Sequence, residues 1–207
     1  MGPQADRSRV CLIVNADDLG LSAAVNDGIF AAHRDGIVTS TSLMVLRDEA
    51  PAAVAALGEH PGLVVGLHLE AGEDLRRQLD RFRELVGRDP THLDSHKHVH
   101  EADAAIGAAA EALAAGLGVP LRNRAIRYER RFYGRDAISP EYLMTLIEEL
   151  PPGWTEIGCH PAAGPVPTSS YDAERQIELA TLRDPEVKDL LNVSNVNLCS
   201  FAQAPRP

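Results

Sequence analysis

Short apolar runs alternate with amphipathic segments from one end of the chain to the other. Continuous runs of aliphatic and β-branched residues are typical of buried strands, whereas apolar residues at three- and four-residue spacing indicate helices. The runs predict strands at residues 10–15, 37–46, 63–69, 91–95, 118–123, 154–160 and 193–200. The periodic segments predict helices at about 23–35, 49–58, 72–87, 101–116, 140–150 and 171–182, and a short one after Asp184.

Residues that favour helix ends bound several of these segments. Ser22 is a candidate N-cap for the first helix, which Asp35-Gly36 ends. The run Ser139-Pro140-Glu141 combines an N-cap, a proline at the first helical position and an acid in the first turn. These signals support the boundaries that the apolar spacing predicts.

Alternation of strands and helices through one chain predicts parallel strands joined by crossover helices. The chemically interesting residues, Asp17, Asp18, His68, His96 and His160, all lie at or just after the ends of predicted strands. A barrel gathers such positions around one mouth, whereas an open dinucleotide-binding sheet would carry a glycine fingerprint, which the chain lacks. We therefore expect an α/β fold, a distorted TIM-like (β/α) barrel with fewer than eight regular strands.

Length and charge narrow the class of protein. The chain has 207 residues, of which 44% are hydrophobic, so we expect a disordered segment at 1–9 and one domain at 10–207. A formal charge of −10 argues against nucleic-acid binding, and no apolar run is long enough to span a membrane. Three scattered cysteines and a start without an apolar leader predict a cytoplasmic protein. The sequence is compatible with a homodimer but does not determine the oligomeric state.

Two adjacent carboxylates, Asp17 and Asp18, end the first predicted strand in the run N-A-D-D-L-G. Neighbouring residues of an extended chain point to opposite sides, so the pair can act together only if a turn or bulge bends it into the mouth. One could then bind a cation while the other takes a proton. The alternative is a solvent-exposed turn that caps the next helix, and the pair alone does not decide between them.

Histidines provide the strongest local signal. The run T-H-L-D-S-H-K-H-V-H at 91–100 places four of them around Asp94, and imidazole is the usual zinc ligand. In an extended chain His92, Asp94, His96, His98 and His100 share one side, whereas a helix after His96 would pair His96 with His100. We predict metal binding here. The alternatives are a solvated histidine-rich turn, or a cluster that supports the metal ligands without binding the metal itself.

Two further histidines end apolar strands. His68 alone would more often be a core residue than a ligand, and Glu70 points to the same side at the rim. His160 fits a general acid, an orienting residue or a core histidine. No G-x-S-x-G elbow is present, which argues against a serine hydrolase. Trp154, Tyr128, Tyr133 and Tyr171 could line a sugar site, although isolated aromatics more often pack in a core.

Taken in order, these motifs resemble the YdjC-like (ChbG/HpnK-type) carbohydrate deacetylase family. The matching runs are N-A-D-D-L-G-L-S at 15–22, G-I-V-T-S-T-S-L-M-V at 36–45, V-G-L-H-L at 65–69, T-H-L-D-S-H-K-H-V-H at 91–100 and E-I-G-C-H-P at 156–161. A late run, Y-D-A-E-R-Q-I-E-L at 171–179, is similar to a helix of that family and contains Arg175. The resemblance covers nearly the whole chain.

The resemblance implies hydrolysis of an N-acetyl group from an amino sugar, with one divalent ion, Mg²⁺ or Zn²⁺. Carried over by position, Asp18, His68 and His96 would be the metal ligands and Asp17 the general base. His160 would assist as an acid or bind the oxyanion. Asp94, His98, His100 and Arg175 would bind substrate or support the ligands.

One departure from the family concerns the mouth. The segment between His68 and Thr91 is short here, where family members carry a long excursion over the substrate. We therefore expect the helix at 72–87 to pack on the barrel and leave the mouth open. An open mouth favours an N-acetylated amino sugar attached to a larger aglycone or polymer, because the small disaccharide would be less enclosed.

Two other functions fit parts of the sequence. A metal-dependent phosphoester hydrolase on a histidine-rich barrel would account for the H-x-H spacing of 96–100, although such enzymes carry H-x-H after the first strand, where this chain has Asp-Asp. A catalytically decayed sugar- or metal-binding protein would have lost part of the site, yet every candidate ligand and base is present.

Overall fold

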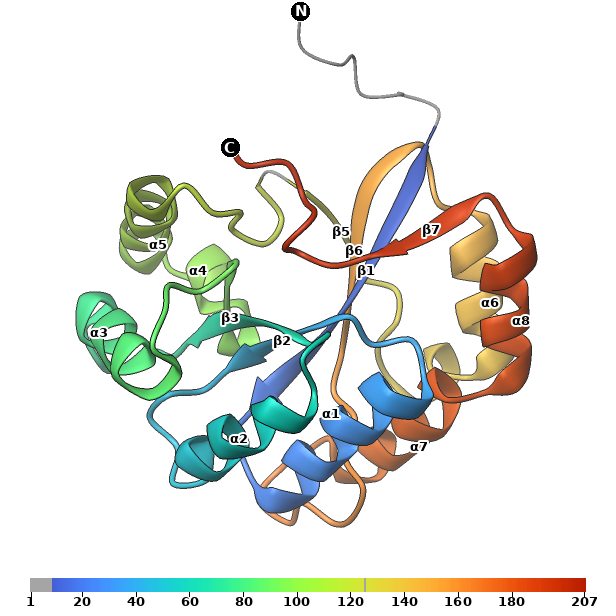
Figure 1. The fold of residues 1–207 in the computed structure, drawn as a ribbon, viewed down its shortest axis with the longest axis horizontal. Coiled ribbons are helices and arrows are strands. Elements are labelled where there is room, and N and C mark those ends of the chain that lie inside the picture. Colours follow the sequence, from blue (N-terminus) through green and yellow to red (C-terminus); the bar gives the residue numbers. More distant parts are fainter. Residues whose placement is uncertain (1–8, 125) are drawn as a thin grey trace, which may run out of the picture.

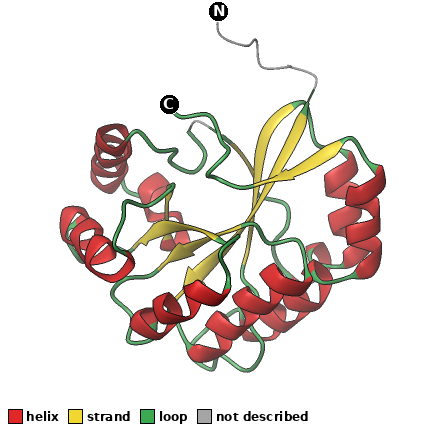
Figure 2. Ribbon diagram, viewed as in Figure 1, coloured by secondary structure: helices red, strands yellow, loops and turns green. Residues whose placement is uncertain are grey.

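The computed structural model describes residues 9–124 and 126–207, so most of the predicted disordered segment at 1–9 lies outside the described residues. A curled parallel sheet forms the centre, and helices cover its outer side (Figure 1, Figure 2). The strands are β1 (Val10–Leu19), β2 (Ser40–Leu43), β3 (Val64–Leu69), β4 (Leu93–Ser95), β5 (Arg127–Glu129), β6 (Gly153–Cys159) and β7 (Val196–Cys199). The helices are α1 (Ala23–Asp35), α2 (Ala50–Ala56), α3 (Leu75–Val86), α4 (Val99–Ala102), α5 (Ala104–Leu117), α6 (Pro140–Glu148), α7 (Asp172–Leu182) and α8 (Pro185–Val193).

The long strand β1 organises the sheet. The order is β4-β3-β2-β1-β6-β5, with every pairing parallel. Strand β7 pairs with the first half of β1, from Val10 to Ile13, whereas β2 pairs with its second half, from Asn15 onwards. The second half of β1 therefore carries its polar residues to the carboxyl edge, where the active sites of parallel α/β folds lie.

Single bridges connect the two edge strands. Leu121 pairs with Leu93 of β4, and the next residue, Arg122, pairs with Ile126 directly before β5. The sheet thus curls into a half-barrel whose open side is crossed by residues 121–122. This arrangement confirms the predicted α/β, distorted TIM-like fold with fewer than eight regular strands.

Side chains alternate between two environments along β1. Leu12, Val14 and Ala16 belong to the large apolar core between the sheet and the helices. Cys11 and Ile13 belong to a separate small cluster at the opposite end of the barrel from the mouth, which includes Phe201 of the C-terminal segment. The inward positions above that cluster are polar, so the upper half of the barrel interior holds charge instead of an apolar core.

Most predicted elements are confirmed, with three differences. Strand β2 is much shorter than the predicted 37–46, and the predicted helix at 101–116 is divided at Asp103, whose side chain accepts hydrogen bonds from the first turn of α5. The predicted strand at 118–123 makes only the two bridges, while β5 follows a few residues later and was not predicted.

Two glycines of the inner face make room for large rings. A Cβ at Gly66 would lie 2.4 Å from the His92 ring, and one at Gly158 would lie 2.6 Å from the Tyr128 hydroxyl. The His92 ring in turn stacks on Phe201, with 3.7 Å between centroids. His92 is therefore a packing residue far from the mouth, and burial lowers its pKa to about 4.

In the part of the chain that the structure describes, no helix is both long and apolar enough to cross a membrane. The cytoplasmic location and the homodimer remain predictions from the sequence.

Replacing Gly66 tests the packing of the barrel interior. Gly66→Ala should lower the free energy of unfolding by about 2 kcal/mol or more, because the His92 ring is held between this position and Phe201. Gly116→Ala is the matched control: it lies in exposed helix α5 with open space around it, and should stabilise by up to about 1 kcal/mol. Urea denaturation of both variants measures the difference, and equal stabilities would contradict this packing.

Candidate metal centre

The two adjacent aspartates separate at a bulge near the end of β1. The register with β2 shifts between Ala16 and Leu19, and Asp18 has a positive φ of 70°. Asp17 consequently points into the barrel while Asp18 reaches the mouth, and both are buried. The prediction that a bulge must bend the pair is confirmed, and backbone strain at a non-glycine residue is typical of functional sites.

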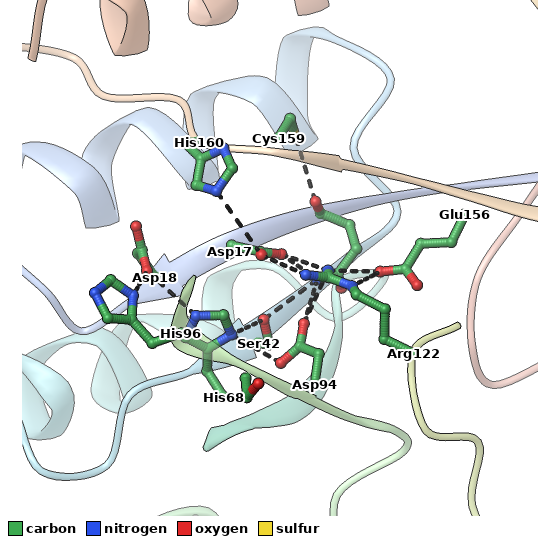
Figure 3. Close-up of polar contacts among 12 residues, drawn as sticks. Asp17, Asp18, Ser42, His68, Asp94, His96, Arg122, Glu156, Cys159 and His160 are labelled. Carbon is green, nitrogen blue, oxygen red and sulfur yellow. Dashed lines mark hydrogen bonds and ion pairs between the residues drawn. The ribbon is translucent and has the colours of Figure 1, made fainter. Parts of the chain in front are cut away.

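Asp18, His68 and His96 come together from β1, β3 and the turn after β4 (Figure 3). Asp18 Oδ1 lies 3.4 Å from His68 Nε2 and 3.0 Å from His96 Nδ1, and one ligand atom from each residue lies within 4.8 Å of the others. One carboxylate and two imidazoles form a donor set that suits zinc and related divalent ions. The residues therefore fit the metal that the resemblance implies.

His68 is held in place from behind. Its Nδ1 lies 2.8 Å from Asp94 Oδ1 and 3.2 Å from Ser42 Oγ, so Nε2 faces Asp18. Burial lowers the pKa of His68, but the charge of Asp94 and the hydrogen bonds to Asp18 and Asp94 outweigh it and raise the pKa well above its usual value. A carboxylate behind a histidine is a common way to orient a metal ligand.

Asp18 has one oxygen engaged and one turned toward the histidines. Arg175 of α7 donates a 2.6 Å hydrogen bond to Asp18 Oδ2, which leaves Oδ1 for His68 and His96. Burial raises the pKa of Asp18, but the histidine hydrogen bonds hold it well below its usual range. Arg175 thus contacts and orients a candidate ligand, and its predicted role in supporting the ligands or binding substrate stays a prediction.

A buried arginine binds the remaining acids of the barrel interior. Arg122 donates to both oxygens of Asp17 at 2.6 and 2.7 Å, and its Nε and a terminal nitrogen donate to Glu156 Oε1 (Figure 3). The same guanidinium lies 2.9 Å from Asp94 Oδ2. All four side chains are almost completely buried, so the ion pairs and hydrogen bonds of this network compensate for the lost hydration of the charges.

The network decides between two groups of residues that could hold a cation. Asp17, His68 and Asp94 also lie close enough to share an ion. However, Arg122 already binds both Asp17 and Asp94, so its positive charge would repel a metal there. Arg122 makes no contact of this kind with Asp18, which leaves the Asp18, His68 and His96 group as the candidate metal centre.

His160 directly follows β6, on the opposite side of the mouth from His68 and His96. Its Nε2 lies 3.9 Å from Asp17 Oδ2 and its Nδ1 lies 3.8 Å from Glu178 Oε1. Burial lowers the pKa of His160, but the nearby carboxylates of Glu178 and Asp17 raise it above its usual value overall. Glu178 also accepts from the His160 backbone N–H, so it positions this residue.

The other histidines of the 91–100 run separate from the candidate ligands. Lys97 and His98 both have a φ of 53°, and this turn carries His98 toward the Tyr128 ring, 5.3 Å away between centroids. His98 lines the pocket, and burial lowers its pKa to about 4. The buried His100 bonds Ser95 and the Arg122 carbonyl instead. Neither belongs to the candidate metal group in the described residues.

The site opens into a pocket of about 830 Å³ whose lining includes Asp17, Asp18, His68, His96 and His160. Tyr128, Tyr133 and Tyr171 also line it, whereas Trp154 packs in the small cluster at the other end of the barrel. Three of the four aromatics considered from the sequence therefore border the pocket.

Sequence reasoning missed several residues of the site. Arg122, Glu156 and Glu178 were not predicted, nor were Asn15 and Ser42, which bond Asp17 and His68 respectively. The usable signal was a charged residue within an otherwise apolar strand, as in W-T-E-I-G-C-H for Glu156. Such a residue is costly to bury unless it is paired.

Comparison with known proteins assigns the family. The family described as "YdjC-like protein" matches residues 11–73 and 70–193, and the chain belongs to it. A carbohydrate deacetylase of Geobacillus stearothermophilus is 35% identical, covering 94% of this chain and 98% of the relative. A chitooligosaccharide deacetylase of Serratia marcescens is 33% identical, covering 92% of this chain and 97% of the relative.

Solved structures agree on the fold. A protein of Enterococcus faecalis V583, provisionally named a cellobiose-phosphate cleavage protein, has a TM-score of 0.85 and 26% identity, covering 94% of this chain and 98% of its own. A family 4 carbohydrate esterase of Streptomyces lividans, solved with acetate, has a TM-score of 0.61 and 12% identity. The match covers 95% of this chain and 96% of the esterase. The second likeness shows the fold alone.

Glu156 makes the stability of the barrel depend on pH. Burial raises the pKa of this carboxyl from 4.5 to about 7, against the opposing effect of Arg122. A raised folded-state pKa means that the stabilisation is present below pH 4.5 and is lost as the pH rises through about 7. Between these values the free energy of unfolding of the wild type should fall by about 3 kcal/mol more than that of Glu156→Gln.

Urea denaturation at a series of pH values measures this difference. Glu156→Gln retains an oxygen that can accept from Arg122, so it serves as a matched, non-titrating variant. Identical pH dependence of the two proteins would show that Glu156 does not titrate in this window.

Proposed function

We propose that this chain is a metal-dependent hydrolase that removes an N-acetyl group from an amino sugar and releases acetate. The observation that carries the proposal is the convergence of Asp18, His68 and His96 at the mouth, beside Asp17 and His160. The names of the two relatives, carbohydrate deacetylase and chitooligosaccharide deacetylase, support the reaction and the class of substrate.

The metal would be held by Asp18 Oδ1, His68 Nε2 and one nitrogen of His96. When bound, a divalent ion supplies Lewis acidity, which polarises the acetamide carbonyl and lowers the pKa of water. Two imidazoles favour zinc among such ions, while the carboxylate also suits magnesium. Asp94 keeps His68 in the orientation that binding requires.

Asp17 is suited to accept the proton of the attacking water. Burial raises its pKa, but Arg122 outweighs this effect and lowers it overall, so the carboxylate is ionised at neutral pH. The same two hydrogen bonds fix its orientation, and its neighbour Asp18 is a proposed metal ligand. A positioned base of this kind contributes about 10²- to 10⁴-fold to a rate.

His160 is suited to give a proton to the departing amine. Its raised pKa favours the protonated form, and its Nε2 faces the same space as Asp17. A protonated imidazole there also stabilises negative charge on the acetamide oxygen. Asp17 and His160 thus provide a base and an acid on one side of the candidate metal centre.

The phosphoester alternative has less support in the geometry. The H-x-H spacing of 96–100 does not deliver its histidines together, because His100 is directed to Ser95 and the Arg122 carbonyl. A decayed site is also less consistent with the structure, since the candidate ligands, base and acid all meet at one pocket.

The open mouth favours a large substrate. Helix α3 buries Leu79 and Phe82 against the barrel, as predicted, instead of covering the pocket. The family match divides at residues 70–73, directly after His68. The alignment with the Geobacillus relative runs over 243 positions against 207 residues here, so that relative carries segments which this chain lacks. We infer a preference for an amino sugar on a larger aglycone or polymer.

Two variants separate the proposed ligand from the proposed base. His68→Ala should lose stoichiometric metal together with acetate release, whereas Asp17→Asn should keep the metal and lose about 10²- to 10⁴-fold in kcat. Metal analysis and acetate release measure both effects. His60→Ala is the control, because His60 stacks on Phe30 outside the pocket. Full metal and activity in His68→Ala would refute the assignment, as would a normal kcat in Asp17→Asn.

Substrate size tests the open mouth. An extended N-acetylglucosaminyl conjugate should have a kcat/KM at least about tenfold above that of N,N′-diacetylchitobiose, because contacts beyond the sugar add binding energy. Steady-state acetate release on both substrates gives the ratio. Equal or better use of the disaccharide would show that another part of the protein encloses the sugar.

A further inference from the structure

One aromatic ring at the mouth lies unusually exposed. Tyr133 is 58% exposed, whereas every other phenylalanine, tyrosine and tryptophan among the described residues is buried or half-buried. Its neighbours in sequence are fixed: Phe132 is buried, and the Gly134 N–H donates to the Tyr171 hydroxyl at 2.9 Å. The exposure of Tyr133 therefore belongs to an anchored segment.

The inner face of this ring is already occupied. Tyr133 stacks on Tyr171 with 4.5 Å between ring centroids and 7° between planes. The Tyr171 hydroxyl donates at 2.7 Å to Glu178, the carboxylate that also binds the His160 backbone. Tyr171 is thus a rigid base for Tyr133, which lines the pocket and stays largely exposed although one of its faces is covered.

The ring lies close to the proposed chemistry. Its centroid is 5.8 Å from that of His160, whose Nε2 is 3.9 Å from Asp17. Three hydroxyl side chains, Thr168, Ser169 and Ser170, line the same pocket. An apolar face bordered by hydroxyl groups is complementary to a pyranose ring, which has apolar C–H faces and a polar edge.

We propose that Tyr133 is the stacking platform for the sugar ring that carries the reacting acetamide. A sugar on its outer face extends its acetamide past His160 toward Asp17 and the candidate metal centre. The proposal rests on the proposed function and adds the residue that orients the sugar. Stacking acts on bound sugar before and after hydrolysis, so its loss should weaken binding with little effect on kcat.

Substitutions that remove or keep the ring test this role. Tyr133→Ala should raise KM for N-acetylglucosamine tetramer by about tenfold, while kcat changes by less than about threefold. Tyr133→Phe and Tyr133→Trp should stay within about twofold of the wild type in KM, since they retain an aromatic face. Tyr133→Leu should resemble the alanine variant, because it is apolar without a flat ring.

Calorimetric binding of the deacetylated product, glucosamine tetramer, gives a readout without turnover. Its Kd should rise about tenfold in Tyr133→Ala. Ile177→Ala, which removes an exposed apolar side chain that is not part of the pocket lining, should leave both KM and Kd unchanged. Unchanged binding in Tyr133→Ala, or full function in Tyr133→Leu, would overturn the platform.

The two proposals fail in different ways. If the wild type releases no acetate but binds both tetramers through Tyr133, the deacetylase function is wrong and the platform stands. If it releases acetate while Tyr133→Ala behaves like the wild type, the platform alone is wrong. A wild type that neither hydrolyses nor binds these sugars would overturn both.

Discussion

The guanidinium of Arg122 is the charge on which the interior of this barrel depends. It lies among Asp17, Asp94 and Glu156, three carboxylates that are almost completely removed from water. Burial opposes the charge of Arg122, but these acids raise its pKa well above its usual value. Removing one partner of such a buried group costs about 3–5 kcal/mol, since the other charges are left uncompensated. The polar upper half of the barrel is therefore tolerated because the arginine is there.

The same interaction assigns different roles to neighbouring acids. Asp17 and Asp18 are adjacent in sequence, yet the bulge sends one to Arg122 and the other to two histidines. Compensation by Arg122 makes Asp17 an oriented, ionised base candidate, and leaves Asp18 as the acid with an oxygen directed at the candidate metal position. Asp94 links the two parts, since it contacts both Arg122 and His68. The electrostatics of the network and the geometry of the candidate metal centre are thus inseparable.

Much of this arrangement follows from strand periodicity. The apolar runs predicted most of the strands, and the two-residue repeat predicted that His68 and Glu70 share one side and that the aspartates need a bulge. The repeat could not rank the histidines of 91–100. His92 and His96 share the inner side, but they lie at different depths in the barrel. His92 packs against Phe201, whereas His96, four residues later, lines the pocket at the mouth. His98 and His100 are redirected by positive φ values that no sequence pattern indicated.

The residues that were missed owe their roles to pairing over long sequence distances. Arg122 binds Asp17 across 105 positions and Glu156 across 34, and its own segment forms bridges instead of a regular strand. A lone arginine in G-V-P-L-R-N carries no local sign of such partners. Strand β5, only three residues long, was likewise missed because its pattern R-Y-E is charged and short. Local patterns identified the candidate ligands, whereas the charge compensation that supports them became visible only in three dimensions.

Because Arg122 binds Asp17 and Asp94, we expect a cation to bind at Asp18, His68 and His96 instead. Anomalous X-ray diffraction from crystals grown with Zn²⁺ or Co²⁺ locates such an ion directly. We predict one anomalous peak within about 2.0–2.2 Å of Asp18 Oδ1, His68 Nε2 and a His96 nitrogen, with Arg122 still bound to Asp17. A peak between Asp17 and Asp94, with Arg122 displaced from both, would contradict it.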